Sequence, residues 1–379
     1  MNICTVVQSG RLMYEAALLL ITYNATNTDS NNQFYICIPK NGINWSSDPS
    51  KIPTELIDFY ISQGAKISYF ENSDWGSVYP HSNKIYALKC LPSGEPFMFL
   101  DSDMIILGSI SDSMMNFDYP SAHDEGNTFP TKKDGMYSEE KIWESLYSRF
   151  KLDSRLSKIK NKYNYFNAGA FYYKCPRLFL DKFYYFAKEI WFNPHKELKE
   201  QALNPWLDQV CLPLVINSLG GGRGKLDRRI NYRIYEKHQD IKSLDIEEAI
   251  AFHYHSLYKL YLPGMEEVLR KVKHMVKPYS KIFIENEYFY RYLITSKIEL
   301  DMSESQSIYR ISRKSGKTEK VDKVLAKKEI IDSLRDLAIL MEEFDVESSL
   351  AVMNIAKFHR PNGGVINQKI VEYEKLISN

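Results

Sequence analysis

The chain has 379 residues, of which 44% are hydrophobic and 26% are charged, so it can bury a substantial core and is long enough for two domains. Its 49 basic and 48 acidic residues leave a formal net charge of +1, which excludes an overall positive field that would hold nucleic acid. We expect no nucleic-acid partner. We also expect at most peripheral contact with a membrane, because the sequence contains no run of about 18 apolar residues.

The five cysteines are odd in number and widely separated, and most of them lie in apolar stretches. This pattern is typical of buried, reduced thiols rather than of a disulfide framework. The N-terminal sequence also lacks a basic segment followed by a long apolar one, the signature of a secretory signal peptide. These features together predict a cytoplasmic protein.

Short apolar runs alternate with helical patterns through the first hundred residues, which predicts an α/β fold with a mostly parallel sheet. The predicted strands are residues 3–7, 34–39, 66–70 and 96–100, and the predicted helices are residues 12–23, 53–63 and 82–91. Further on, the pattern predicts strands at 163–173 and 248–256 and helices at 179–192 and 205–219. Pro205 is expected near the first turn of the last of these helices.

The sequence becomes predominantly helical after Pro263. The helices predicted there are residues 264–276, 281–294, 327–344, 346–359 and 365–377. Between them, the polar stretch 301–323 has few core-forming residues and predicts a linker or an exposed hairpin.

Two aspartates, Asp101 and Asp103, follow the predicted strand 96–100 directly, at the strand end where ligands bind in open α/β sheets. Residues i and i+2 of an extended segment share a face, so both carboxylates can reach one hard cation while Ser102 points away. A turn or a helix cap is the commoner explanation of Asp-Ser-Asp alone. Two unpaired carboxylates beside a buried strand would be costly, however, which favours a cation or a donor nearby.

Two histidines, His253 and His255, lie at the end of the predicted strand 248–256 and would share a face for the same reason. One imidazole with two carboxylates suits Mn²⁺ or Mg²⁺ with open positions for a diphosphate, and Mn²⁺ tolerates nitrogen better. The alternative is a pair of hydrogen-bonded histidines near the sheet. A zinc site would need an HExxH motif or a Cys/His cluster, and the sequence contains neither.

Four segments in order carry a resemblance to a known family: "FLDSDMIIL" (99–107), "YFNAGAFYY" (165–173), "WLDQVCL" (206–212) and "HYHSLYKLY" (253–261). The first resembles the Asp-x-Asp segment of GT-A glycosyltransferases. The ordered set resembles the retaining group that includes glycogenin and the bacterial lipopolysaccharide galactosyltransferases. The resemblance implies a GT-A (Rossmann-like) fold, with a mixed, mostly parallel sheet flanked by helices and a C-terminal helical appendage.

The resemblance also implies a role for each matching residue. It places the metal ion on Asp101, Asp103 and His253, and the catalytic candidates Asp208 and Gln209 beside the hydroxyls and the reacting carbon of the donor sugar. Asp208 could act as a general base or as an orienting carboxylate, and on its predicted helix it could instead be a first-turn partner of the helix dipole. Glycine and alanine after Asn167 make sense, because small residues let backbone amides approach a sugar closely. The other implied donor-binding residues are Ser102, Asn167, Ala168, Gly169 and Lys259, together with Asp101.

Some positions depart from the family pattern. Ser256 replaces a glycine, residues 260–261 replace a Pro-Trp pair, and the N-terminal segment lacks an Asp-x-x-Tyr motif. These differences predict a divergent branch with its own donor. Lys84 could reach a donor phosphate or ribose, and Arg11 and Tyr14 could contact the nucleotide, although such residues are more often structural or solvated.

The glycine-rich stretch 219–229 does not match a Walker loop. Leu219 stands where the motif requires its first glycine, and Leu226 stands where it requires serine or threonine. We expect a mobile loop, with a lid over the site as one option, and with Arg223 and Lys225 as weak candidates for phosphate contacts.

We therefore expect a metal-dependent glycosyltransferase that moves a sugar, with retention, from a nucleotide-diphosphate donor to a glycan, lipid-linked or protein acceptor. The alternatives are a nucleotide- or glycan-binding protein without turnover, or a metal-dependent hydrolase. The expected parts are a catalytic domain at 1–262, a helical extension at 263–300, a polar linker or hairpin at 301–323, and a small helical region at 324–379.

Overall fold

The computed structural model describes residues 1–28, 30–124, 139–159, 162–194, 203–221, 226–233, 248–255, 265–279 and 346–378, with residues 198 and 282 and part of 331–342. Contacts divide the chain into two compact units, Met1–Tyr254 and His255–Asn379. All described residues of the candidate site belong to the first unit.

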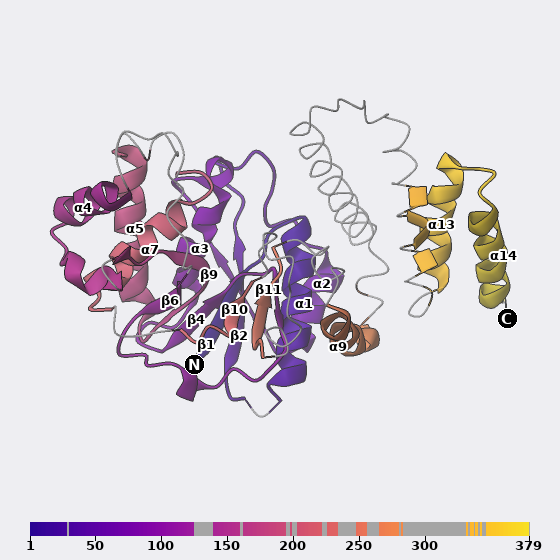
Figure 1. The fold of residues 1–379 in the computed structure, drawn as a ribbon, viewed down its shortest axis with the longest axis horizontal. Helices are drawn as coiled ribbons and strands as arrows, with labels where there is room; N and C mark the ends of the chain where they lie inside the picture. Colours follow the sequence, from indigo (N-terminus) through magenta and orange to yellow (C-terminus); the bar gives the residue numbers. More distant parts are fainter. Residues whose placement is uncertain are drawn as a thin grey trace, which may run out of the picture. The chain divides into compact units, whose positions relative to one another are not determined.

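A six-stranded sheet with the order β3-β2-β1-β4-β9-β6 forms the centre of the first unit (Figure 1). β1 (Asn2–Val6), β2 (Gln33–Pro39), β3 (Lys66–Phe70) and β4 (Phe97–Leu100) are parallel. β9 (Phe166–Tyr173) runs antiparallel to β4, and β6 (Ser121–Asp124) runs antiparallel to β9. The predicted α/β class with a mixed, mostly parallel sheet is confirmed.

β1, β2, β4 and β9 are buried along nearly their whole length because both faces of the sheet are covered there, whereas β3 at the edge of the sheet is partly exposed. Cys4 and Val6 of β1 belong to a buried cluster that also contains side chains of four helices. These helices are α3 (Asn83–Tyr86), α4 (Glu139–Arg149), α5 (Pro176–Phe192) and α7 (Leu207–Ser218). Ile3 and Thr5, which point to the opposite face by strand alternation, are completely buried as well. The remaining helices of this part of the chain are α1 (Arg11–Thr26) and α2 (Thr54–Ser62).

A second, three-stranded sheet brings distant segments to the end of β4. Its strands are β10 (Ile230–Tyr232), β11 (Ala251–His253) and β5 (Met104–Ile106), in that order. β5 begins directly after Asp103 and pairs antiparallel with β11, so that His253 lies opposite Met104. The helix α1 supports β5, because the amide of Ile106 donates to Thr22 Oγ1 at 3.0 Å.

Several predicted elements differ from the observed ones. Residues 82–91 do not form one helix, because α3 is short and is flanked by the 3₁₀ turns Pro80–Ser82 and Ala87–Cys90. α7 begins at Leu207, so Pro205 precedes the helix. The strand predicted at 248–256 is only the three residues of β11. β5, β6 and β10 were not predicted, since runs of three or four residues show no clear periodicity.

The second unit is described through three helices, α9 (Glu266–Val276), α13 (Val346–His359) and α14 (Gly364–Ser378). Ile366, Ile370 and Tyr373 of α14 are buried, at the spacing of one helix face. The helices predicted at 264–276, 346–359 and 365–377 are confirmed, whereas the predictions for 281–294 and 301–323, and most of 327–344, lie outside the described residues. No helix in the described ranges is long and apolar enough to cross a membrane.

We expect Thr22→Val to lower the free energy of unfolding by about 1–3 kcal/mol, because it leaves the buried amide of Ile106 without an acceptor. Thr26→Val is the matched control. The Thr26 hydroxyl donates to carbonyls of its own helix and accepts from Nδ2 of Asn27, which also donates to the carbonyl of Tyr23 and so keeps a partner. Loss of the Thr26 hydroxyl should therefore cost less than about 0.5 kcal/mol. Urea denaturation measures both variants. Equal costs would show that Thr22 does not anchor β5.

Candidate active site

Asp101 and Asp103 lie where the chain passes from β4 to β5. The amide of Asp101 donates to the carbonyl of Gly169 at 2.8 Å, and the amide of Tyr254 donates to the carbonyl of Asp103 at 3.1 Å. Ser102, which is buried, and Asp103 form a turn, so the period-two argument for the two carboxylates was wrong. The carboxylates nevertheless face one site, because the turn and the pairing of β5 with β11 direct them there.

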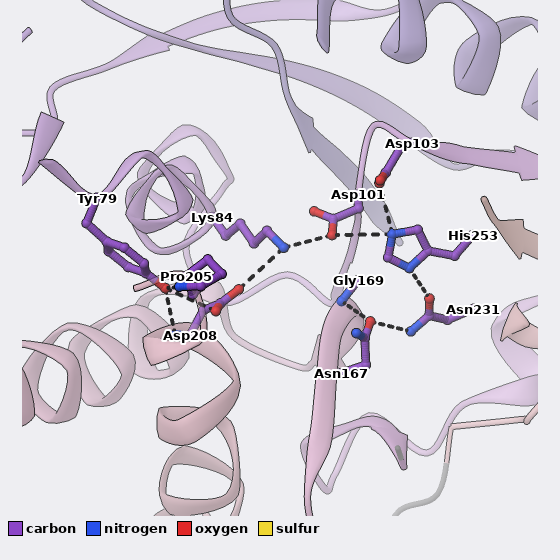
Figure 2. Close-up of polar contacts among 10 residues, drawn as sticks. All are labelled: Tyr79, Lys84, Asp101, Asp103, Asn167, Gly169, Pro205, Asp208, Asn231 and His253. Carbon is purple, nitrogen blue, oxygen red and sulfur yellow. Dashed lines mark hydrogen bonds and ion pairs between the residues drawn. The ribbon is translucent and has the colours of Figure 1, made fainter. Parts of the chain in front are cut away.

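His253 at the end of β11 faces both carboxylates (Figure 2). Its Nε2 atom lies 3.0 Å from Oδ1 of Asp103 and 3.9 Å from Oδ2 of Asp101. One ligand atom from each of these three residues lies within 4.8 Å of the others. His255 does not belong to this group, and its positive φ of 59° marks a change of backbone direction after the strand. Two carboxylate oxygens and one imidazole nitrogen are a suitable donor set for Mn²⁺ or Mg²⁺.

Lys84 of α3 connects the aspartate pair to a third carboxylate. Its Nζ atom lies 2.7 Å from Oδ2 of Asp101 and 3.4 Å from Oδ2 of Asp208. Burial lowers the pKa of Lys84, but the charges of Asp101 and Asp208 outweigh that effect, so the net shift is upward and the ammonium stays charged. Burial raises the pKa of Asp101, and the charge of Asp103 adds to this rise, which Lys84 only partly offsets.

Asp208 lies in the first turn of α7 and is almost completely buried. Its Oδ1 atom accepts a hydrogen bond from the Tyr79 hydroxyl at 3.0 Å, and its own amide donates to the same hydroxyl oxygen at 2.8 Å. Burial, together with the charge of Asp208, raises the pKa of Tyr79, so the hydroxyl remains a donor. Gln209 follows on the same turn and is half-buried. Through Lys84, the structure brings the predicted catalytic and metal-binding carboxylates together.

The Asn-Ala-Gly segment of β9 packs against the ring of His253. The amide of Gly169 donates to Oδ1 of Asn167 at 2.8 Å, and the same oxygen accepts from Nδ2 of Asn231 at 2.9 Å. A side chain at Gly169 would collide with the His253 ring, because an added Cβ would lie 2.6 Å from Nδ1. The side chain of Ala168 packs into the core cluster, so only its backbone can take part in binding.

The sequence matches the family model described as the Rhodobacterales glycosyltransferase domain over residues 3–220, which is more than half of the chain. The chain belongs to this glycosyltransferase family. The predicted class of enzyme is thereby confirmed, and the hydrolase and the non-catalytic binding protein are disfavoured. The match covers the segments that carry the aspartates, Asn167 and Asp208. It ends before Asn231 and His253, which only the fold brings to the site.

Several solved structures of glycosyltransferases show a distant similarity to this chain. The galactosyltransferase LgtC, in complex with donor and acceptor sugar analogues, is 13% identical, with a TM-score of 0.45 over 72% of this chain and 96% of that one. GlyE of Streptococcus pneumoniae is 15% identical, with a TM-score of 0.42 over 72% and 59%. Mouse xyloside xylosyltransferase 1 is 11% identical, with a TM-score of 0.39 over 67% and 97%. The family assignment does not depend on these likenesses. Comparison with curated proteins gave no match.

A cavity of about 340 Å³ opens beside the aspartates of this glycosyltransferase. Its walls include Gln8 and Arg11 after β1, His81 before α3, and Lys84. Tyr14 instead belongs to the buried core. The predictions missed His81, Tyr79 and Asn231 as site residues. A lone histidine, tyrosine or asparagine has no periodic signal, and only the chain's packing reveals its position.

Three predicted phosphate-contacting residues, Lys259, Arg223 and Lys225, lie outside the described residues. Their proposed roles therefore remain predictions.

We expect Gly169→Ala to destabilise this glycosyltransferase by about 1–3 kcal/mol, because the new methyl group would displace the His253 ring and the Asn167 amide. Gly108→Ala is the matched control. An added Cβ there would meet Ile250 at 3.6 Å, an ordinary contact distance, so its effect should stay within about 0.5 kcal/mol. Chemical denaturation compares the two variants, and an equal effect would contradict the close packing at Gly169.

Proposed function

We propose that this glycosyltransferase binds a nucleotide-diphosphate sugar through a divalent cation, Mn²⁺ or Mg²⁺, held by Asp101, Asp103 and His253. The convergence of their three ligand atoms within 4.8 Å, at the end of β4 and beside a cavity, carries this proposal. The bound cation would neutralise the charge that develops on the diphosphate as the sugar departs. The imidazole in the donor set favours Mn²⁺ over Mg²⁺.

Lys84 would supply a second, permanent positive charge for the donor phosphates. Its raised pKa keeps it protonated, and its two carboxylate partners hold the ammonium in place before the donor arrives. Ser102 and Lys84 line the cavity together with Gln8 and Arg11, which would receive the nucleoside. We assign Lys259 to the diphosphate on the family resemblance.

Asp208 and Gln209 would lie beside the reacting carbon of the donor sugar. The Tyr79 hydroxyl and the Lys84 ammonium fix both oxygens of Asp208, so this carboxylate can act without reorganisation. Asn167, with the backbone of Ala168 and Gly169, would line the sugar from β9. We propose that transfer retains the anomeric configuration and that the acceptor is a glycan, a lipid-linked molecule or a protein, because the resembling group acts in this way.

The proposal extends to the arrangement of the chain and its location. We propose a catalytic domain at 1–262, a helical extension at 263–300, a polar linker or hairpin at 301–323 and a small helical region at 324–379. The five cysteines are free in the structure, which supports a cytoplasmic site of action.

Donor binding can be tested by thermal denaturation with a panel of nucleoside diphosphates, with and without Mn²⁺. A ligand at about 100 times its Kd should raise the Tm of the wild-type chain by about 3–5 °C. Asp101→Asn keeps the shape of the side chain but replaces a charged metal ligand with a neutral, weaker one. We expect this variant to lose the Mn²⁺-dependent part of the shift.

Asp118→Asn is the matched control, since the carboxylate of Asp118 is exposed and pairs with the surface residue Lys174, at 3.6 Å. It should retain the full shift. An unchanged Mn²⁺-dependent shift in Asp101→Asn would contradict the metal site. The absence of a shift with every nucleotide would contradict the donor class.

We expect Asp208→Asn to lower kcat by about 100-fold or more while the Mn²⁺-dependent Tm shift persists, because the neutral amide retains the shape but not the charge of the carboxylate. Product release from a panel of nucleotide sugars measures kcat once a donor is known. A variant that loses donor binding and turnover equally would instead assign Asp208 to donor recognition.

A further inference from the structure

The hydrogen bonds below His253 form a chain in which each partner fixes the next. The amide of Gly169 can only donate, so the Asn167 atom that it meets at 2.8 Å must be the oxygen. That oxygen lies 2.9 Å from the amide group of Asn231, which must therefore present its NH₂. The other side-chain atom of Asn231, its oxygen, lies 2.7 Å from Nδ1 of His253.

This order leaves one arrangement of protons on the neutral imidazole. An oxygen facing Nδ1 requires a proton on Nδ1, because a neutral imidazole has one donor nitrogen and one acceptor nitrogen. Nε2 faces the carboxylates, 3.0 Å from Oδ1 of Asp103, so without a cation a second proton can occupy this nitrogen, and a bound cation would take the place of that proton on the Nε2 lone pair. Figure 2 shows the sequence of contacts from Gly169 to Asp103. A metal ion binds a histidine nitrogen only through such a lone pair.

The position of Asn231 suits it to hold the proton of His253 on Nδ1. Its side chain is completely buried, so water does not compete for its oxygen or its NH₂. Its backbone has a positive φ of 68°, in the left-handed region that asparagine tolerates better than most residues. Asn231 belongs to β10, beside the strand that carries His253.

We propose that Asn231 is a positioning residue, anchored by Asn167, that holds His253 in the Nδ1–H tautomer and so prepares Nε2 to bind the cation. The inference rests on the proposed metal site. It assigns Asn167 a structural task besides its proposed contact with the donor sugar.

The tautomer can be measured directly on the metal-free, full-length chain. Histidine-selective ¹⁵N labelling distinguishes protonated from unprotonated ring nitrogens, and His253→Gln identifies the signal. At an alkaline pH where the imidazole is neutral, we expect His253 to carry its proton on Nδ1 in the wild type. A proton on Nε2 would overturn the proposal whether or not the chain binds a metal.

The effect on the cation is measured by calorimetric titration of Mn²⁺ into the full-length chain without donor. Asn231→Gly removes the acceptor and suits the positive φ, so we expect Mn²⁺ affinity to fall about 10- to 100-fold. Asn167→Ala lets the Asn231 amide turn over and present its NH₂ to Nδ1, so affinity should also fall. Thermal denaturation confirms that each variant is folded.

The double variant Asn167→Ala, Asn231→Asp provides the decisive comparison. A carboxylate at 231 can only accept, so it restores the Nδ1–H tautomer without the anchor, and Mn²⁺ affinity should return to within a few-fold of the wild type. A purely structural role for Asn167 predicts no recovery. Wild-type Mn²⁺ affinity in Asn231→Gly would also overturn the proposal.

Asp101→Asn distinguishes a failure of the positioning role of Asn231 from a failure of the proposed metal site. If the wild type and Asp101→Asn bind Mn²⁺ equally weakly, the cation proposal fails, and the tautomer measurement alone decides the role of Asn231.

Discussion

The charge balance at the end of β4 is the constraint on which the site depends. Asp101, Asp103 and Asp208 place three carboxylates in a largely buried region, and Lys84 is the cation that contacts two of them. Buried carboxylates are costly unless opposite charge or hydrogen bonds compensate them. Lys84 pairs with Asp101 and Asp208, Tyr79 also donates to Asp208, and Asp103 faces Nε2 of His253. A divalent cation would complete the balance.

This balance requires segments that are far apart in the sequence. The parallel strands deliver Asp101 and the loop after β1 to one edge of the sheet, as in other open α/β folds. The short β5 then pairs with β11 and carries His253 to the same edge. The helical side contributes Lys84 and Asp208. The site is therefore an outcome of topology, and its described residues all belong to the first unit.

The sequence allowed most of the main sheet to be predicted, because its strands are continuous apolar runs between helical patterns. Asp101 and Asp103 could be singled out from their place directly after such a run, although the reason given for their convergence was wrong. A turn at Ser102, not an extended backbone, directs them. Asn231 could not be predicted, because its contacts arise from the pairing of β10, a strand of three residues that is too short to show a sequence pattern. Tyr79 and His81 lie in an irregular region, where periodicity carries no information.

Gly169 has a consequence for how members of this family can vary. The missing side chain leaves room for the His253 ring, which lies directly against the β9 backbone. Positions 169 and 253 are therefore coupled through shared volume rather than through charge. In a homologue, any larger residue at the first position must be accompanied by a smaller or displaced residue at the second. Under the proposed metal site, such a chain would need a third ligand for the cation from another part of the sheet edge.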